Sequence, residues 1–469
     1  MSFELYEYKI EDLGKVITGK TPPSKISDAF SAQGIPFVTP KDMDGRRLID
    51  KTERYLSSQG VEAVRNCLLP QNSIAVSCIG SDMGKTVLLP GESITNQQIN
   101  AIVVDSEHFD YKYVYYYLST LQDDFKAIAG GSATPILNKG HFSQFKVSLP
   151  VKPVQNKIAL ILDSLDTKIE VNTEINHTLE QMAQALFKSW FVDFEPVKAK
   201  MAVLESGGSQ EDATLAAMTA ISGKNADALA VFEREHPEQY AELKATAELF
   251  PLAMQDSELG EIPEGWTLSE IGAQIDIAGG ATPSTKTPDF WDNGDIHWTT
   301  PKDLSNVKDK ILLHTERKIT KAGLGKISSG LLPVNTVLMS SRAPVGYLAI
   351  AKVPVAINQG YIAMKCNKEL SPEFVLQWCS ANMPEIISRA SGTTFAEISK
   401  KNFNPIPLVK PPLELVKNYT KQVSAIYSLI ENTMRENNSL TELRDTLLPK
   451  LLSGEITLPE AEQIISEEA

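Results

Sequence analysis

Two long stretches of the chain carry apolar side chains at heptad spacing, which predicts long helices at residues 151–197 and 412–454. A shift of 261 residues converts the first apolar series into the second. Because a sustained heptad repeat places one seam of a helix against another helix, the two helices are expected to pair as a coiled coil. The residues expected at the seam are Leu165, Ile169, Asn176, Leu179, Ile426, Ile430, Asn437 and Leu440.

The alternative for any single stripe of this kind is an ordinary buried helix face. Here two stripes occupy equivalent positions of a repeated pattern, which favours pairing with each other. Asn176 and Asn437 each fall at a core position, where a polar side chain costs stability but favours one register. We expect these asparagines to specify antiparallel pairing; the alternative is that both are exposed to solvent.

Residues 1–150 and 257–411, which precede the helices, have a different pattern. They contain short apolar runs, such as 73–76 and 335–339, separated by Gly, Pro and Asn, which is typical of strands. The aromatic segment 111–121 predicts a helix among them. The sequence therefore predicts an α+β fold: two tandem mixed domains, each followed by a long helix, with the two helices pairing as an antiparallel coiled coil.

Short identical strings show that the whole arrangement is duplicated. Thr39-Pro40-Lys41-Asp42 recurs as Thr300-Pro301-Lys302-Asp303 at an offset of 261 residues. Asn96-Gln97 recurs as Asn358-Gln359 at an offset of 262, and Thr21-Pro22 returns as Thr282-Pro283. Identical strings in the same order, with a nearly constant offset, indicate one module of about 195 residues used twice.

Residues 198–256 have no counterpart in the repeat and are expected to form an acidic helical connector, with helical stretches at 212–221 and 226–250. The net charge is -14 for the whole chain and -8 for residues 198–265, whereas the two mixed domains together carry +2. A total of -14 argues by itself against a nucleic-acid partner. Because the acidity resides in the connector, the helices and the tail at 455–469, a basic face on each mixed domain is compatible with the total.

The composition, 42% hydrophobic, is typical of a globular protein, and we expect it to be cytoplasmic. No apolar run reaches the roughly 18 residues of a membrane span, and the acidic N-terminus lacks the order of a signal peptide. The four cysteines and six histidines show no CxxC or HxxxH spacing, so neither a metal site nor a disulfide framework is expected.

No stretch carries a recognisable active site, so no catalytic residue is expected. Residues 80–86 resemble a phosphate-binding loop, but three residues separate the two glycines where four are needed. A chain of 469 residues without catalytic signatures favours binding over chemistry.

The sequence resembles the specificity (S) subunits of type I restriction-modification systems, the HsdS family, over nearly its whole length. The duplication carries this resemblance together with three segments: ALFKSWFVDFEPV at 185–197, DSELGEIPEGW at 256–266 and LLPKLLSGEI at 447–456. The long connector is a departure from the family pattern, and it puts the spatial relation of the two modules in doubt.

The resemblance implies that residues 1–150 and 257–411 are target-recognition domains, each reading one half of a bipartite double-stranded DNA target. It implies that the central helical spacer (151–197) and the distal one (412–454) act as a ruler and dock two methyltransferase subunits, and that two restriction subunits complete the complex. This chain would then hold no cofactor, because S-adenosylmethionine, ATP and Mg²⁺ belong to the partner subunits.

The duplication also separates candidate DNA-binding residues by role. If the two half-sites differ, residues identical in both copies cannot discriminate between them, so they serve the framework or contact phosphates. Base readers are expected where the copies diverge, since Arg and Lys match guanine edges and Asn matches adenine edges. The candidate base readers, for each of which the alternative is a solvated surface side chain, are Arg46, Arg47, Lys85, Lys286, Asn293 and Arg342. The candidate framework or phosphate contacts are Lys41 and Lys302, for which the alternative is a helix-start or turn role beside Pro and Asp. Lys139, Lys400 and Lys401, close to the loop that leads into each long helix, are further candidate phosphate contacts.

Two other function classes stay open at this point. The chain could be a stand-alone tandem-module protein that binds a protein or glycan, for which the acidic total would be natural. It could also be an enzyme with an unfamiliar site, which predicts turnover by the purified chain alone.

Overall fold

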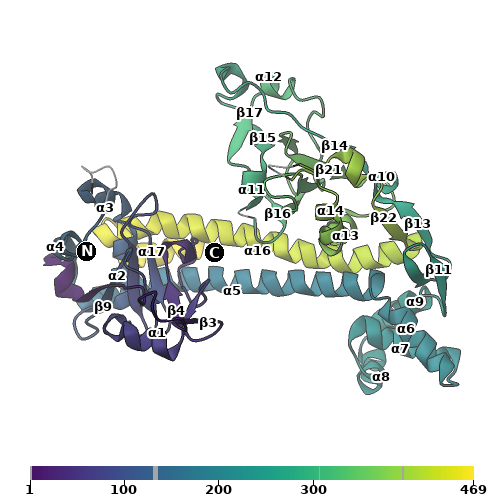
Figure 1. Ribbon diagram of the computed structural model, residues 1–469, viewed down its shortest axis with the longest axis horizontal. Helices are drawn as coiled ribbons and strands as arrows, with labels where there is room; N and C mark the ends of the chain where they lie inside the picture. Colours follow the sequence, from purple (N-terminus) through teal and green to yellow (C-terminus); the bar gives the residue numbers. More distant parts are fainter. Residues whose placement is uncertain (1–2, 130–135, 306, 393–395, 469) are drawn as a thin grey trace. The chain divides into compact units, whose positions relative to one another are not determined.

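The computed structural model describes residues 3–129, 136–305, 307–392 and 396–468. The chain divides into two compact units, one of Met1–Val171 with Glu436–Ala469 and one of Asn172–Arg435. Each unit is built from one mixed α/β domain and a part of each of the two long helices (Figure 1).

The mixed domain of the first unit contains two four-stranded sheets. The larger, antiparallel sheet has the order β2 (Gly14–Thr18), β9 (Ile99–Val104), β6 (Ser73–Ser77) and β7 (Thr86–Leu89). The smaller has the order β3 (Phe30–Ser31), β5 (Tyr55–Leu56), β4 (Ile35–Val38) and β8 (Ile94–Thr95), with β4 and β8 parallel. The remaining elements are β1 (Tyr6–Lys9), β10 (Lys146–Leu149), α1 (Ser58–Ala63), α2 (Tyr111–Ser119), α3 (Gln122–Ala129) and α4 (Lys139–Gln144).

The mixed domain of the second unit repeats this plan. Its larger sheet has the order β14 (Asp276–Ala278), β21 (Tyr361–Lys365), β18 (Val337–Ser340), β19 (Leu348–Ala351) and β16 (Ile311–Leu312). Its smaller sheet joins β17 (Arg317–Ile319), β15 (Ile296–Thr299) and β20 (Val355–Ile357), with β15 and β20 parallel. The other elements are β11 (Met254–Ser257), β12 (Gly260–Pro263), β13 (Thr267–Glu270), β22 (Pro407–Lys410), α10 (Ile271–Gln274), α11 (Pro301–Ser305), α12 (Lys321–Leu324), α13 (Pro372–Ala381), α14 (Met383–Ser388) and α15 (Lys400–Phe403).

The sequence-based expectation of a duplicated α+β fold is therefore confirmed. Strand β6 is buried along its full length, as its apolar run predicts, and β18 is likewise buried. Helix α2 begins where the side chain of Asp110 accepts a hydrogen bond from the amide of Tyr113, which satisfies one of the free amides of the first turn. The aromatic face of α2 then packs into the core of the first unit.

The two predicted long helices are α5 (Lys152–Phe191, 40 residues) and α16 (Leu413–Ser453, 41 residues). In the first unit the N-terminal half of α5 and the C-terminal half of α16 lie side by side and antiparallel (Figure 1). Leu165 and Leu447 are buried there in one core. In the second unit, Trp190 of α5 and Tyr419 of α16 are buried together, with their ring centroids 5.9 Å apart.

The connector forms four helices, α6 (Glu195–Glu205), α7 (Gln210–Ser222), α8 (Ala226–Glu235) and α9 (Pro237–Glu248), of which the last three share a small core of their own. The helical stretch expected at 226–250 is interrupted at His236, because Pro237 cannot donate a backbone hydrogen bond and so begins a new helix. Lys200 of α6 is buried and donates to the carbonyl of Phe250 at 2.6 Å, which ties the connector together.

The acidic tail is not an extended segment, because α17 (Leu458–Glu468) packs Ala461, Ile464 and Ile465 on the core of the first unit. Among the described residues, no helix is long and apolar enough to cross a membrane.

Candidate nucleic-acid interface

The identical strings of the two modules converge on one edge of the smaller sheet in each domain. In the first domain, Thr39-Pro40-Lys41-Asp42 follows β4 and Asn96-Gln97 follows β8. Because β4 and β8 are parallel, their carboxyl ends meet at the same edge. The parallel strands β15 and β20 bring Thr300-Pro301-Lys302-Asp303 and Asn358-Gln359 together in the same way. We call these two places the shared edges.

A buried or half-buried aspartate holds each shared edge together. Oδ2 of Asp42 accepts hydrogen bonds from the amide and hydroxyl of Thr39, at 2.8 and 2.7 Å. Its Oδ1 accepts from the amide of Glu53 at 2.8 Å. In the second domain Asp303 accepts from Thr300 and from the amide of Glu316 in the same pattern. These aspartates are therefore framework residues.

Exposed amide side chains complete each shared edge. Thr21 donates its hydroxyl proton to Oε1 of Gln97 at 2.8 Å, and Thr282 donates to Gln359 at the same distance. Both glutamines are exposed. Asn96 points inward instead, and its Oδ1 accepts from the amide of Gln98. The identical residues thus include a buried framework and an exposed polar rim.

Five candidate lysines lie at the shared edges or at the start of a short helix, and all five are exposed. Lys41 and Lys302 project from the shared edges, and Nζ of Lys302 is paired with Glu316 at 3.0 Å. Lys139 and Lys400 are the first residues of α4 and α15, and Lys401 follows in α15. Lys41 and Lys139 of the first module are thus matched by Lys302 and Lys400 of the second, whereas Lys401 takes the place of Gly140.

The candidates at divergent positions have mixed surroundings. Lys286 and Asn293 are exposed, and Asn293 adopts a left-handed backbone conformation with φ 57°. Arg46 is paired with Asp44 and Asp50, Lys85 with Asp82 at 2.9 Å, and Arg342 with Glu397 at 3.8 Å. The structure places Arg46 and Lys85 at one pocket and Arg342 in the other domain.

Arg47 is placed differently from the sequence-based expectation of a reader on a divergent loop. Its guanidinium is largely buried against α5, with Nη1 2.6 Å from Asp163 and Nε 2.9 Å from Glu170. Burial works against the charged form, but the bonds to Glu170 and Asp163 outweigh it and raise the pKa of Arg47. Arg47 therefore anchors the first domain to its helix.

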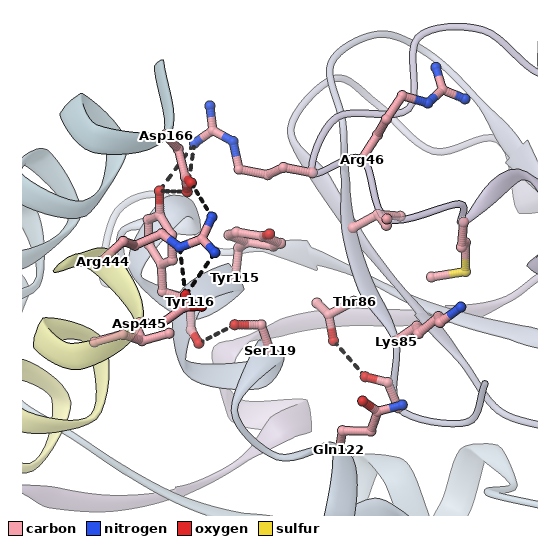
Figure 2. A pocket seen from close by; sticks show the side chains of 16 residues that line it. Arg46, Lys85, Thr86, Tyr115, Tyr116, Ser119, Gln122, Asp166, Arg444 and Asp445 are labelled. Atoms are coloured by element: carbon pink, nitrogen blue, oxygen red, sulfur yellow. Dashed lines mark hydrogen bonds and ion pairs between the residues drawn. The ribbon is translucent and has the colours of Figure 1, made fainter. Parts of the chain in front are cut away.

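A pocket of about 370 Å³ is lined in part by Arg47, and Figure 2 shows the side chains around it. The hydroxyl of Tyr116 donates to Oδ2 of Asp166 at 2.6 Å, and Arg444 approaches the same carboxylate from α16. The cationic side chains that line the pocket each have a carboxylate partner: Arg46, Arg47, Lys85 and Arg444. The positive charges around the pocket are therefore compensated by carboxylates of the same chain.

The predicted seam residues divide between the two units. In the first unit, Leu165 and Leu440 belong to one core, and Nδ2 of Asn437 lies 3.5 Å from the carbonyl of Ile169. In the second unit Leu179, Ile426 and Ile430 belong to the core, and Asn176 donates to Asp309 of the mixed domain at 3.3 Å. The role of the two asparagines in setting the helix register stays a prediction.

Sequence reasoning missed the repeated string Thr52-Glu53-Arg54, which recurs as Thr315-Glu316-Arg317. Its offset of 263 residues is close to the 261 and 262 of the other repeated strings, so the signal was present in the sequence. The residues that pair Arg47 with α5 were also missed, but they lie more than 100 positions away and carry no local signal.

Comparison with known proteins gives consistent results. The model of the type I restriction modification DNA specificity domain matches residues 4–181 and 263–442. The HindI specificity subunit of Haemophilus influenzae is 36% identical over 67% of this chain and 70% of its own length. The MjaIX specificity subunit of Methanocaldococcus jannaschii is 24% identical over 96% of this chain and 93% of its own. The crystal structure of the S subunit from M. genitalium has the same fold, with a TM-score of 0.50 at 14% identity and 96% coverage of both chains.

Proposed function

Since this chain belongs to the type I restriction-modification specificity family, with a DNA specificity domain in each half, we propose that each domain reads one half of a bipartite duplex target. The observation that carries this proposal is the pair of shared edges. Two domains that differ in their loops present the same rim of Thr21–Gln97 and Thr282–Gln359 hydrogen bonds. A common rim with divergent loops suits contacts that position DNA, combined with contacts that read different bases.

The long helices provide the second part of the proposal, in which they hold methyltransferase subunits. In the first unit, Leu160 of α5 is 70% exposed and Val171 lies on the same face, eleven residues on. In the second unit, Ile175 and Met182 of α5 are exposed seven residues apart, and Met182 is 54% exposed. Exposed apolar side chains that share a helix face are typical of a surface covered by a partner protein.

The proposal leaves the chemistry to the partner subunits. Methyltransferase subunits would bring S-adenosylmethionine, and restriction subunits would bring the ATP and Mg²⁺ chemistry, in a cytoplasmic complex. The net charge of -14 supports this division, because such a chain needs basic partners to bind DNA tightly at physiological salt. The family match does not favour a stand-alone protein- or glycan-binding module.

Methylation mapping tests the proposal. The chain is expressed with a methyltransferase subunit of the same restriction-modification system, in a host that lacks both, and the modified motif is read by sequencing. We expect one bipartite motif with two unlike halves and a fixed spacer. A motif without a spacer, or modification that does not depend on this chain, contradicts the proposal.

A second experiment tests the helices as a ruler. Four residues are inserted in α5 after Val171 and four in α16 after Arg435, which lengthens each helix by about 6 Å. We expect a spacer longer by one or two base pairs with both half-sites unchanged. Altered half-sites with an unchanged spacer contradict the ruler.

A further inference from the structure

The repeated Thr-Glu-Arg string places an arginine at the same structural position in each domain. The carbonyl of Arg54 accepts a hydrogen bond from the amide of Phe37 at 3.0 Å, beside the carboxyl end of β4. In the second domain Arg317 of β17 lies opposite Trp298 of β15 in the antiparallel strand pair. The preceding glutamate is the residue whose amide bonds to the aspartate of the shared edge. Each arginine is thus one residue away from a shared edge.

The backbone that carries these arginines is held in the same way in both domains. The hydroxyl of Thr52 donates to the carbonyl of Arg54 at 2.6 Å, and Thr315 donates to Arg317 at 2.7 Å. Together with the backbone bond from Phe37 to Arg54 and the pairing of β17 with β15, these bonds fix the Cα position of each arginine. The side chain therefore starts from a rigid base.

Each guanidinium lies over two aromatic rings. The Cζ atom of Arg54 is 4.6 Å from the centroid of Phe30 and 5.2 Å from that of Phe37. The Cζ atom of Arg317 is 3.7 Å from Trp291 and 5.5 Å from Trp298, and these two residues are the equivalents of Phe30 and Phe37 at an offset of 261. Attraction between the cation and the ring faces orders the side chain before any ligand arrives.

These two arginines also differ from the others in their charge environment. Both are exposed, and within the described part of the chain neither makes an ion pair. Seven of the other eight arginines each form an ion pair with a carboxylate: Arg46, Arg47, Arg65, Arg342, Arg389, Arg435 and Arg444. A stacked guanidinium without a carboxylate partner keeps its donors available for an external anion.

We propose that Arg54 and Arg317 are equivalent phosphate-contacting residues, each clamping the DNA backbone at one half-site so that the divergent loops meet the base edges. The planar guanidinium suits two oxygens of one phosphate. Residues that are the same in both domains contribute positioning and no discrimination between unlike half-sites. The inference rests on the proposed function, because the anion it assigns is a DNA phosphate.

The test measures DNA affinity of the full chain with its methyltransferase partner, by fluorescence anisotropy across a salt series. The probes are a 40-base-pair duplex with the mapped target and one without it. The variants are Arg54→Ala, Arg317→Ala and the double substitution. Arg54→Met keeps a long side chain on the rings without the charge. The matched controls are Arg65→Ala, an exposed arginine paired with Glu62, and Lys318→Ala, the next residue of β17.

Each single alanine variant is expected to weaken binding about tenfold on both duplexes, and the double variant about a hundredfold. The slope of log affinity against log salt should fall by about 0.9 for each phosphate that the variant no longer neutralises. Arg54→Met should unfold at the wild-type temperature while losing the same affinity. The control variants should keep both the affinity and the slope.

Three results would overturn the inference. Wild-type affinity and slope in the double variant would show that the two arginines do not touch DNA. A loss confined to the target duplex, with a relaxed first half-site for Arg54→Ala, would make Arg54 a base reader. Failure of the wild-type complex to bind either duplex would overturn the proposed function as well, so the two failures are distinguishable.

Discussion

Arg444 of α16 places Nη1 2.6 Å from Oδ1 of Asp166 in α5, so an ion pair joins the two long helices inside the first unit. Tyr116 of α2 donates to the other oxygen of the same carboxylate. One buried aspartate therefore joins both helices to the first recognition domain.

The second unit has an equivalent junction with different chemistry. The carbonyl of Arg47 accepts from the amide of Leu88 at 2.9 Å, and that of Lys310 accepts from the amide of Ile350 at the same distance, so Arg47 and Lys310 are equivalent. Nζ of Lys310 lies 2.8 Å from Glu180 of α5, which also accepts from the hydroxyl of Tyr427 in α16. The duplicated modules have kept the place of the junction and changed its partners.

Asp166→Asn is expected to destabilise the first unit, because it removes one charge from a buried pair and leaves Arg444 less compensated. The expected loss is about 3 kcal/mol of unfolding free energy. All five tryptophans lie in the second unit, so urea unfolding followed by tryptophan fluorescence should change little while the circular dichroism transition moves to lower urea. Arg65→Met, at an exposed pair, should leave both transitions in place. Equal shifts of both signals would contradict a role confined to the first unit.

Asp309→Asn is expected to stabilise the second unit at neutral pH by about 1 kcal/mol. Burial raises the pKa of Asp309, and among the described residues no donor reaches the buried Oδ1 of its neighbour Asn176. An amide at position 309 removes the half-buried charge and can donate to that oxygen. The measurement is the unfolding midpoint by tryptophan fluorescence, with the exposed Asp292→Asn as the control.

The same substitution has a pH signature. Because the folded pKa of Asp309 lies above its unfolded value near 3.8, the wild-type aspartate favours folding fully below that value and loses this contribution as pH rises through the folded pKa. The advantage of Asp309→Asn should therefore shrink as pH is lowered from 7.5 toward 4. An advantage that is constant with pH would show that the charge is not its source.

Arg342→Ala is expected to relax the second half-site and leave the first unchanged. Arg342 is at a divergent position, its side chain is 37% exposed, and its contact with Glu397 is long at 3.8 Å. Loss of an arginine that reads a base should reduce discrimination about tenfold at one position. Methylation mapping measures this directly, and the control is Arg389→Ala, at the residue that follows α14 and pairs with Glu385 of that helix. Unchanged preference at every position of both half-sites would exclude Arg342 as a base reader.

Leu160→Glu and Met182→Glu are expected to weaken the complex with the methyltransferase. Each places a charge on an exposed apolar face of α5. Burial of the native apolar side chain by a partner would contribute about 1.5–3 kcal/mol to the binding free energy. Co-purification should fall at least tenfold, with the isolated chain equally stable. Glu174→Gln, exposed on the same helix, should co-purify normally. Full recovery of both glutamate variants with the partner would place the docking surface elsewhere.

Much of the fold could be predicted because its signals are local. The heptads of α5 and α16, the buried run of β6 and the aromatic run of α2 are each read within one short segment. The interruption at His236 was also readable, since Pro237 marks it.

The candidate site was predicted less completely. Comparison of the two modules found Lys41 and Lys302, but it passed over the equally repeated Arg54 and Arg317, whose aromatic partners lie 17 to 26 positions away. The sequence-based expectation for Arg47 differs from its place in the fold, because a charged residue in a divergent loop has the same sequence signature whether it faces solvent or a helix.

The sequence by itself determined that this protein is a duplicated recognition module with long helices, because periodicity and repetition are properties of the chain order. Only the tertiary structure decided which charges are neutralised inside the molecule. Arg47 and Arg54 are seven residues apart in the same domain, yet one is neutralised by Asp163 and Glu170 and the other lies exposed on Phe30 and Phe37. The difference arises because an ion pair depends on distance in space, and the acids that meet Arg47 arrive on a helix more than 100 residues further along the chain.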